Sequence, residues 1–65
     1  MADRAKWFVA KVRRTGEHLE ERRPLSRNFE KKEEAEMERD RLRALPEHAA
    51  WLSENPEWRI DVRFG

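Results

Sequence analysis

The chain has 65 residues, and although 45% of them are charged, its formal net charge is only +1. This length predicts one small α+β domain spanning residues 1–65, and the near-neutral charge is not that of a basic nucleic-acid-binding tail or an acidic solvating segment. The sequence contains no cysteine, which excludes disulfides, thiolate metal ligands and thiol catalysis. A core this small gains stability from dimerisation or from docking on a larger partner.

The first predicted element is a strand over residues 6–13, where apolar and charged side chains interleave. Side chains on a strand point to opposite faces in turn, so one set should join the core and the other should not. We expect the core face to consist of Phe8, Ala10 and Val12. We expect the other face to carry Trp7, Val9, Lys11 and Arg13.

Thr15 and Gly16 predict the turn that follows, because glycine accepts the backbone conformations of a tight hairpin. A two-residue loop would pair Val12 with Leu19 and so place apolar side chains opposite each other. A slightly longer loop containing a bulge is the alternative.

A second strand is predicted over residues 17–23, ending at Pro24. Proline cannot donate a hydrogen bond to a neighbouring strand, and charged side chains discourage further pairing. We therefore expect this strand at an edge of the sheet.

The main helix is predicted over residues 30–45. Glutamates fill the first half of this stretch and arginines the second, which is the charge distribution that the helix macrodipole favours. Its apolar stripe is thin and consists of Phe29, Ala35, Leu42 and Leu45. Pro46 limits this helix and is a suitable first residue for a second, short one over residues 46–53. A single helix with a kink is the alternative.

The strongest pattern in the chain is the last predicted strand, residues 58–64, where apolar and charged residues alternate without a break. One face would bury Trp58, Ile60, Val62 and Phe64. The other would present Arg59, Asp61 and Arg63.

These elements predict an α+β fold with the order β-β-α-β and a three-stranded sheet in the strand order 2-1-3. The connection from the second strand to the third passes over the first through the helices, which makes a split β-α-β unit with a right-handed crossover. Both helices would cover one face of the sheet. The other face would be open.

The expected open face is rich in arginine and carries one tryptophan, and both residue types are enriched at binding hot spots. We expect a partner, protein or nucleic acid, to contact Trp7, Lys11, Arg13, Arg22, Arg59 and Arg63 there. Trp51 on the short helix either caps the core or protrudes toward a partner, and it joins the candidate binding residues.

The strand with Trp7, the hairpin and the stretch Phe29-Glu30-Lys31-Lys32-Glu33-Glu34-Ala35-Glu36 resemble the N-terminal arm-type DNA-binding domain of tyrosine integrases. That resemblance implies DNA contact through the sheet, with Lys11, Arg13 and Arg22 as candidates. The family has three strands before its helix, whereas this chain predicts two before and one after.

The function favoured by the sequence is a non-catalytic protein-interaction module, and the alternative is a nucleic-acid-binding module that uses the same face. The partner would be another protein or a second copy of the chain. We expect no enzyme activity, no cofactor and no metal, because His18 and His48 are far apart and no glycine-rich phosphate loop is present. With no secretory signal or membrane span recognised, we expect a cytoplasmic protein without a membrane partner.

Overall fold

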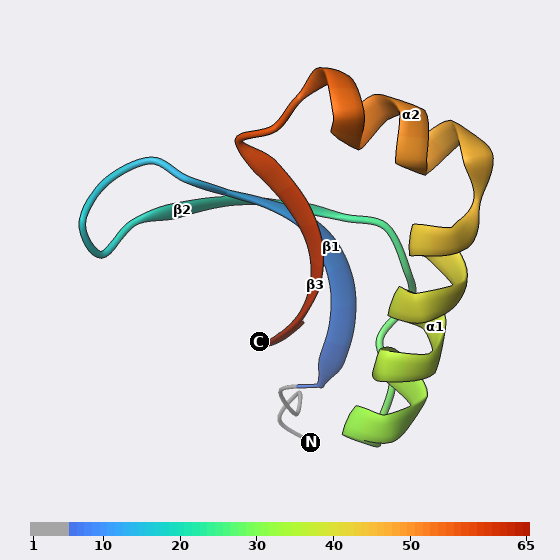
Figure 1. The fold of residues 1–65 in the computed structure, drawn as a ribbon. Helices are drawn as coiled ribbons and strands as arrows, with labels where there is room; N and C mark the ends of the chain where they lie inside the picture. The colour runs from blue at the N-terminus through green and yellow to red at the C-terminus, as the bar shows by residue number, and fades with distance from the viewer. Residues whose placement is uncertain (1–5) are drawn as a thin grey trace.

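A computed structural model describes residues 6–65 of the chain (Figure 1). The elements are, in order, β1 (Trp7–Arg14), β2 (Glu20–Pro24), α1 (Lys32–Ala44), α2 (Pro46–Glu54) and β3 (Trp58–Phe64). The predicted class and element order are therefore confirmed. The last strand also has the predicted bounds.

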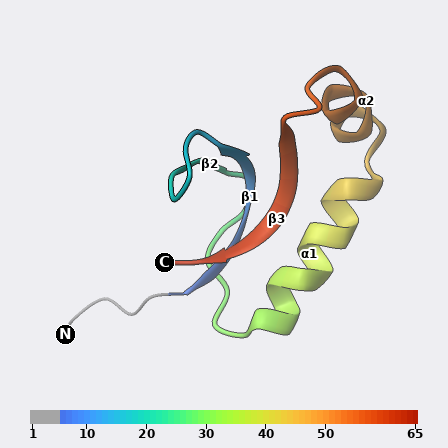
Figure 2. The same cartoon turned by 60° about the vertical axis from the view of Figure 1, so that its left-hand side comes forward.

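The sheet has three strands in the order β2-β1-β3, and β1 is antiparallel to both of its neighbours. The outer strands β2 and β3 therefore run parallel to each other on either side of β1, as a split β-α-β unit requires. Both helices lie on one face of the sheet, and no helix or strand of residues 6–65 covers the other (Figure 2). The predicted topology and the open face are confirmed.

The core lies between α1 and the sheet. Its buried residues are Val9, Phe29, Ala35, Leu42 and Ile60, and partly buried apolar side chains pack around them. The thin stripe predicted for the main helix is thus confirmed at Phe29, Ala35 and Leu42. Leu45 is half-buried, with an extended backbone (φ −71°, ψ 132°), and it separates α1 from α2. The alternative of one kinked helix is therefore wrong.

The predicted hairpin register is wrong. The structure pairs Val12 with Arg22 and Arg14 with Glu20, so the loop extends over residues 15–19 and β2 begins at Glu20. The Thr15 N–H donates to the Leu19 carbonyl (3.1 Å), which closes the longer loop. A register shift by an odd number of residues exchanges the two faces of a strand. Leu19, predicted to face Val12, instead lies in the loop and is 68% exposed.

The predicted core face of β1 is also wrong. The register sets Val9 opposite Val62 and Lys11 opposite Ile60, so the odd-numbered residues of β1 face the helices. Two cationic side chains on that side of the sheet, Lys11 and Arg13, contact tryptophan rings. The Lys11 Nζ lies 3.7 Å from the centre of the Trp51 ring, and the Arg13 guanidinium carbon lies 5.0 Å from the centre of the Trp58 ring. Their aliphatic stems can cover apolar surface while the charges remain on aromatic faces.

None of the helices among residues 6–65 is long and apolar enough to cross a bilayer. The hairpin loop extends from one end of the sheet, away from the helices (Figure 1). A groove lies between this loop and the start of β3.

Candidate interaction surface

We define the open face as the sheet face turned away from α1 and α2. The strand register places these side chains on it: Phe8, Ala10, Val12, Arg14, Glu20, Arg22, Pro24, Arg59, Asp61 and Arg63.

The predicted binding residues fall into two groups. Arg22, Arg59 and Arg63 lie on the open face, as expected. Trp7, Lys11 and Arg13 were expected beside them, and this is wrong, because the register turns all three toward the helix side. The sheet therefore separates the predicted cationic cluster into two parts that cannot contact one ligand on the same face.

Trp7 and Trp51 belong to the covered side of the molecule. The Trp7 ring packs on Phe64 with their centres 4.7 Å apart, and the Trp7 backbone exchanges hydrogen bonds with that of Phe29. Trp51 meets Trp58 edge-on at 5.8 Å and supports Lys11 on its ring. Trp51 therefore contacts Trp58 and Lys11 on the helix side, and whether it binds a partner stays a prediction.

An ion-pair network spans the middle of the open face. Both Glu20 carboxylate oxygens accept from Arg63 (2.9 and 3.0 Å), and Arg22 donates to one of them (2.6 Å). Because Glu20 is on β2 and Arg63 on β3, this pair must cross over β1 between them. Ala10 and Val12 of β1 lie on the same face and are 0% and 1% exposed although no helix covers them.

The same arginines hold Glu20 in its ionised form. Hydrogen bonds from Arg63, and then from Arg22, lower the pKa of Glu20 from 4.5 to about 2. Arg63 also lies 3.2 Å from an oxygen of Asp61. Arg22 and Arg63 are therefore already neutralised by acidic neighbours within the chain.

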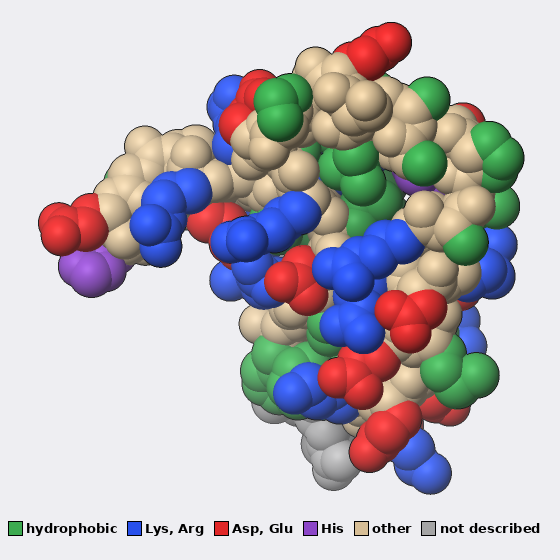
Figure 3. All heavy atoms as spheres, viewed as in Figure 1, with side chains coloured by type: hydrophobic (Ala, Val, Ile, Leu, Met, Phe, Trp, Pro, Cys, Tyr) green, Lys and Arg blue, Asp and Glu red, His purple; other side chains and the backbone are tan. Residues whose placement is uncertain are grey.

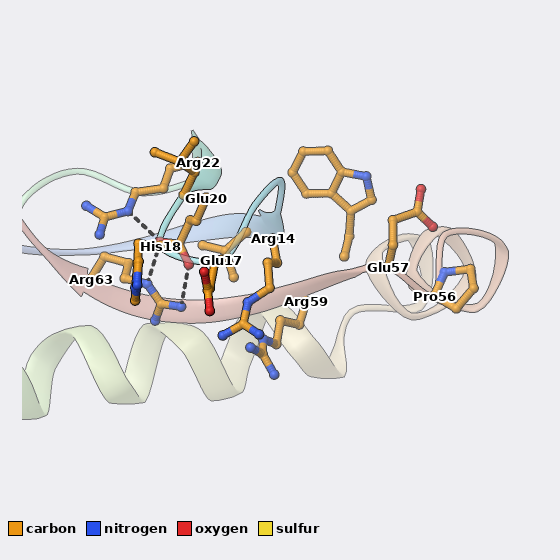
Figure 4. A pocket seen from close by; sticks show the side chains of 12 residues that line it. Arg14, Glu17, His18, Glu20, Arg22, Pro56, Glu57, Arg59 and Arg63 are labelled. Carbon is orange, nitrogen blue, oxygen red and sulfur yellow. Dashed lines mark hydrogen bonds and ion pairs between the residues drawn. The ribbon is translucent and has the colours of Figure 1, made fainter.

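A groove of about 910 Å³ opens beside this network, between the hairpin loop and the start of β3 (Figure 4). It is lined by Val12, Arg14, Glu17, His18, Leu19, Glu20, Arg22, Pro56, Glu57, Trp58, Arg59 and Arg63. Basic and acidic side chains alternate over the neighbouring surface (Figure 3). The groove is thus polar, with Leu19 as its most exposed large apolar side chain.

Arg14 and Arg59 differ from the other arginines of the groove. Within residues 6–65, neither makes an ion pair within 4.0 Å or a side-chain hydrogen bond. Arg59 sits opposite Val12 in the register, so Arg14 is its diagonal neighbour, and the two side chains extend in the same direction (Figure 4). Glu20, which faces Arg14 across the strands, is occupied by Arg63 and Arg22.

Sequence reasoning missed Arg14 because the even-numbered residues of the first strand, with which it shares a face, were predicted to face the core. The strand in fact continues through Arg14. The spacing of Arg14 from Ala10 and Val12 could not have found it, because residues two apart on a strand share a face and that face was expected to be covered.

The outer edge of β3 is blocked by side chains. Arg43 on α1 donates two hydrogen bonds to the Ile60 carbonyl (3.0 and 2.6 Å). The Asp61 carboxylate accepts from the Val62 N–H (2.8 Å), and Arg63 donates to the Val62 carbonyl (2.9 Å). Backbone groups satisfied in this way cannot pair with an added strand.

No group of three His, Asp or Glu side chains suited to a metal ion occurs in the part of the chain that the structure describes. The chain matches no family model, no curated protein and no solved structure. The resemblance to arm-type domains thus gains no support from these comparisons. The structure also departs from that family's arrangement, because β3 follows the helices and Lys11 and Arg13 face them.

Proposed function

We propose that this protein is a non-catalytic protein-interaction module that docks through the open face of its sheet. The observation that carries the proposal is the pair Arg14 and Arg59, which line an uncovered groove and have no acidic partner within residues 6–65. Unpaired guanidinium groups beside a hollow suit an acidic ligand, because arginine binds carboxylates in a planar, two-pronged geometry.

The blocked edge of β3 supports docking through side chains on the face. An extended peptide that adds to a sheet needs a row of free backbone groups. The Ile60 carbonyl and both backbone groups of Val62 are occupied, and β2 is short and ends at Pro24. We therefore expect a partner to bind in the groove and not by adding a strand to either edge of the sheet.

The state of Glu20 favours binding over catalysis in the groove. A general acid or base works best with a pKa near the operating pH. Arg63 and Arg22 instead lower the pKa of Glu20 to about 2, so that it remains an ionised bridge near neutral pH. This carboxylate stabilises the surface and is poorly suited to transferring protons.

Nucleic-acid binding is the second candidate, because Arg14 and Arg59 would also neutralise phosphates. The acidic residues Glu17, Glu20 and Glu57 line the same groove and oppose a polyanion. Trp7, the tryptophan expected on the open face, faces the helices instead, and Trp58, which lines the groove, is only 8% exposed. These two observations rank the protein partner first.

Photo-crosslinking in cells tests the proposal. A photoreactive amino acid replaces His18, which lines the groove, or Met37, which is 74% exposed on α1. We expect position 18 to form a discrete crosslink to one protein, identified by mass spectrometry, and position 37 to form none. A crosslink at position 37 alone, or none at either position, would contradict docking through the open face.

A further inference from the structure

Leu19 is an exposed apolar side chain placed at a charged groove. It is 68% exposed in the loop between β1 and β2, and it lines the groove together with Arg14 and Arg59. That loop projects from the body of the molecule (Figure 3). The loop side of the groove therefore carries one exposed apolar side chain, and two arginines of the groove have no acidic partner in residues 6–65.

We propose that the groove binds an acidic segment of a partner protein that also carries an apolar side chain. Carboxylates of the segment pair with Arg14 and Arg59, and its apolar side chain packs on Leu19. This inference deepens the proposed function and depends on it, because it names the chemistry of the segment that enters the groove.

A peptide fits this surface better than a nucleic acid does. Glu17 and Glu57 line the groove beside the arginines. A polyphosphate chain carries charge at every repeat, so some of that charge would lie against these carboxylates. A peptide can place its carboxylates at the two arginines and uncharged residues elsewhere. Leu19, moreover, offers an apolar contact that a phosphate backbone does not use.

A separate partner also fits better than a second copy of the chain. The acidic residues Glu33, Glu34 and Glu36 are on α1, on the side of the sheet opposite the open face. If α1 of one copy entered the groove of another, the contact would join two different surfaces. Such head-to-tail contacts generate open chains or rings rather than a closed two-fold dimer.

The test measures binding of labelled synthetic peptides by fluorescence anisotropy. The probes are a short peptide with two acidic residues separated by uncharged residues and carrying one leucine, the same peptide with serine for leucine, and a single-stranded oligonucleotide. The proteins are the wild type, the double variant Arg14→Gln/Arg59→Gln, Leu19→Ala, Glu20→Gln, and the control Arg41→Gln. Arg41 is exposed on α1 and pairs with Glu38 there, away from the groove.

The double variant should weaken binding of the leucine peptide by about tenfold or more. Leu19→Ala should weaken it about fivefold and should not affect the serine peptide. Glu20→Gln should tighten it by a few-fold, because Arg22 and Arg63 lose their internal carboxylate partner. Arg41→Gln should bind as the wild type does.

Three outcomes overturn the inference. One is failure of both peptides to bind, and another is binding unaffected by the double variant. The third is tighter binding of the oligonucleotide with no effect of Leu19→Ala, which assigns the groove to nucleic acid. If crosslinking at position 18 still captures one protein while the peptides fail, the chemistry named here is wrong and the proposed function stands.

Analytical ultracentrifugation tests whether the groove is instead filled by a second copy of the chain. If the wild type assembles and the double variant does not, a second copy occupies the groove and the inference is wrong.

Discussion

The bridge from Glu20 to Arg63 and Arg22 predicts how the stability of this fold depends on pH. The perturbation is Glu20→Gln, which keeps the size of the side chain and removes its charge. A carboxyl whose folded-state pKa lies below its unfolded-state value stabilises the fold above the unfolded-state pKa. That contribution is lost as pH falls toward the folded-state pKa. For Glu20 the loss should therefore occur from about pH 5 down to about pH 2.

The size of the effect follows from the displaced pKa. Because one pKa unit corresponds to about 1.4 kcal/mol, lowering the pKa of Glu20 from 4.5 to about 2 sets an upper bound of roughly 3 to 4 kcal/mol. The Glu20 side chain remains 25% exposed and Arg22 is 44% exposed, so solvent screens the pairs. We therefore expect Glu20 to contribute about 1 kcal/mol to the free energy of unfolding near neutral pH.

The assay is urea unfolding followed by tryptophan fluorescence at pH values from about 7 to about 3. The wild type should be about 1 kcal/mol more stable than Glu20→Gln near pH 7, and the difference should shrink as pH falls. Other carboxyls with lowered pKa values, such as Glu21 beside Arg13, titrate in both proteins, so the difference isolates Glu20. Glu17→Gln is the matched control, because Glu17 lies in the same hairpin and makes no ion pair within residues 6–65. Parallel pH profiles for the wild type and Glu20→Gln would refute the reasoning.

Further substitutions test the packing and the blocked strand edge. Ile60→Val should lower the free energy of unfolding by about 1 kcal/mol, because Ile60 is 1% exposed in the core, and a urea melt measures it. Arg43→Met should lower the free energy of unfolding by about 1 to 2 kcal/mol in the same urea melt, because methionine keeps the aliphatic stem but cannot make the two hydrogen bonds to the Ile60 carbonyl. An unchanged unfolding midpoint would contradict this. Asp61→Ala removes the acceptor of the Val62 N–H at the outer edge of β3, so light scattering should show more concentration-dependent self-association than the wild type does. A particle size equal to that of the wild type would contradict the idea that Asp61 keeps this edge from pairing.

The sequence predicted β3 well and β1 poorly, and the difference has a physical cause. In β3 every apolar residue has the same parity, so only one face can be buried. In β1 both parities carry apolar residues, and charge was the deciding criterion. Lys11 and Arg13 lie on the buried side because Trp51 and Trp58 provide rings for them. Those contacts join residues about 40 positions apart, which alternation within one strand cannot reveal.

The hairpin shows a second limit of sequence reasoning. Pairing Val12 with Leu19 satisfied the rule that apolar side chains face each other, yet the structure places Val12 opposite Arg22. Val12 is nonetheless 1% exposed, on the face where the bridge between Glu20 and Arg63 joins the two outer strands. The sequence alone does not show an ion pair between residues 43 positions apart, so an apolar neighbour was predicted for Val12 instead.

Backbone amide chemical-shift mapping with the acidic leucine peptide tests the location of the interaction surface most directly. We predict that the largest shifts fall at Arg14, the hairpin loop and Arg59, which line the groove. Shifts centred instead on Lys11, Trp51 and α2 would place binding on the helix side of the sheet and contradict the account.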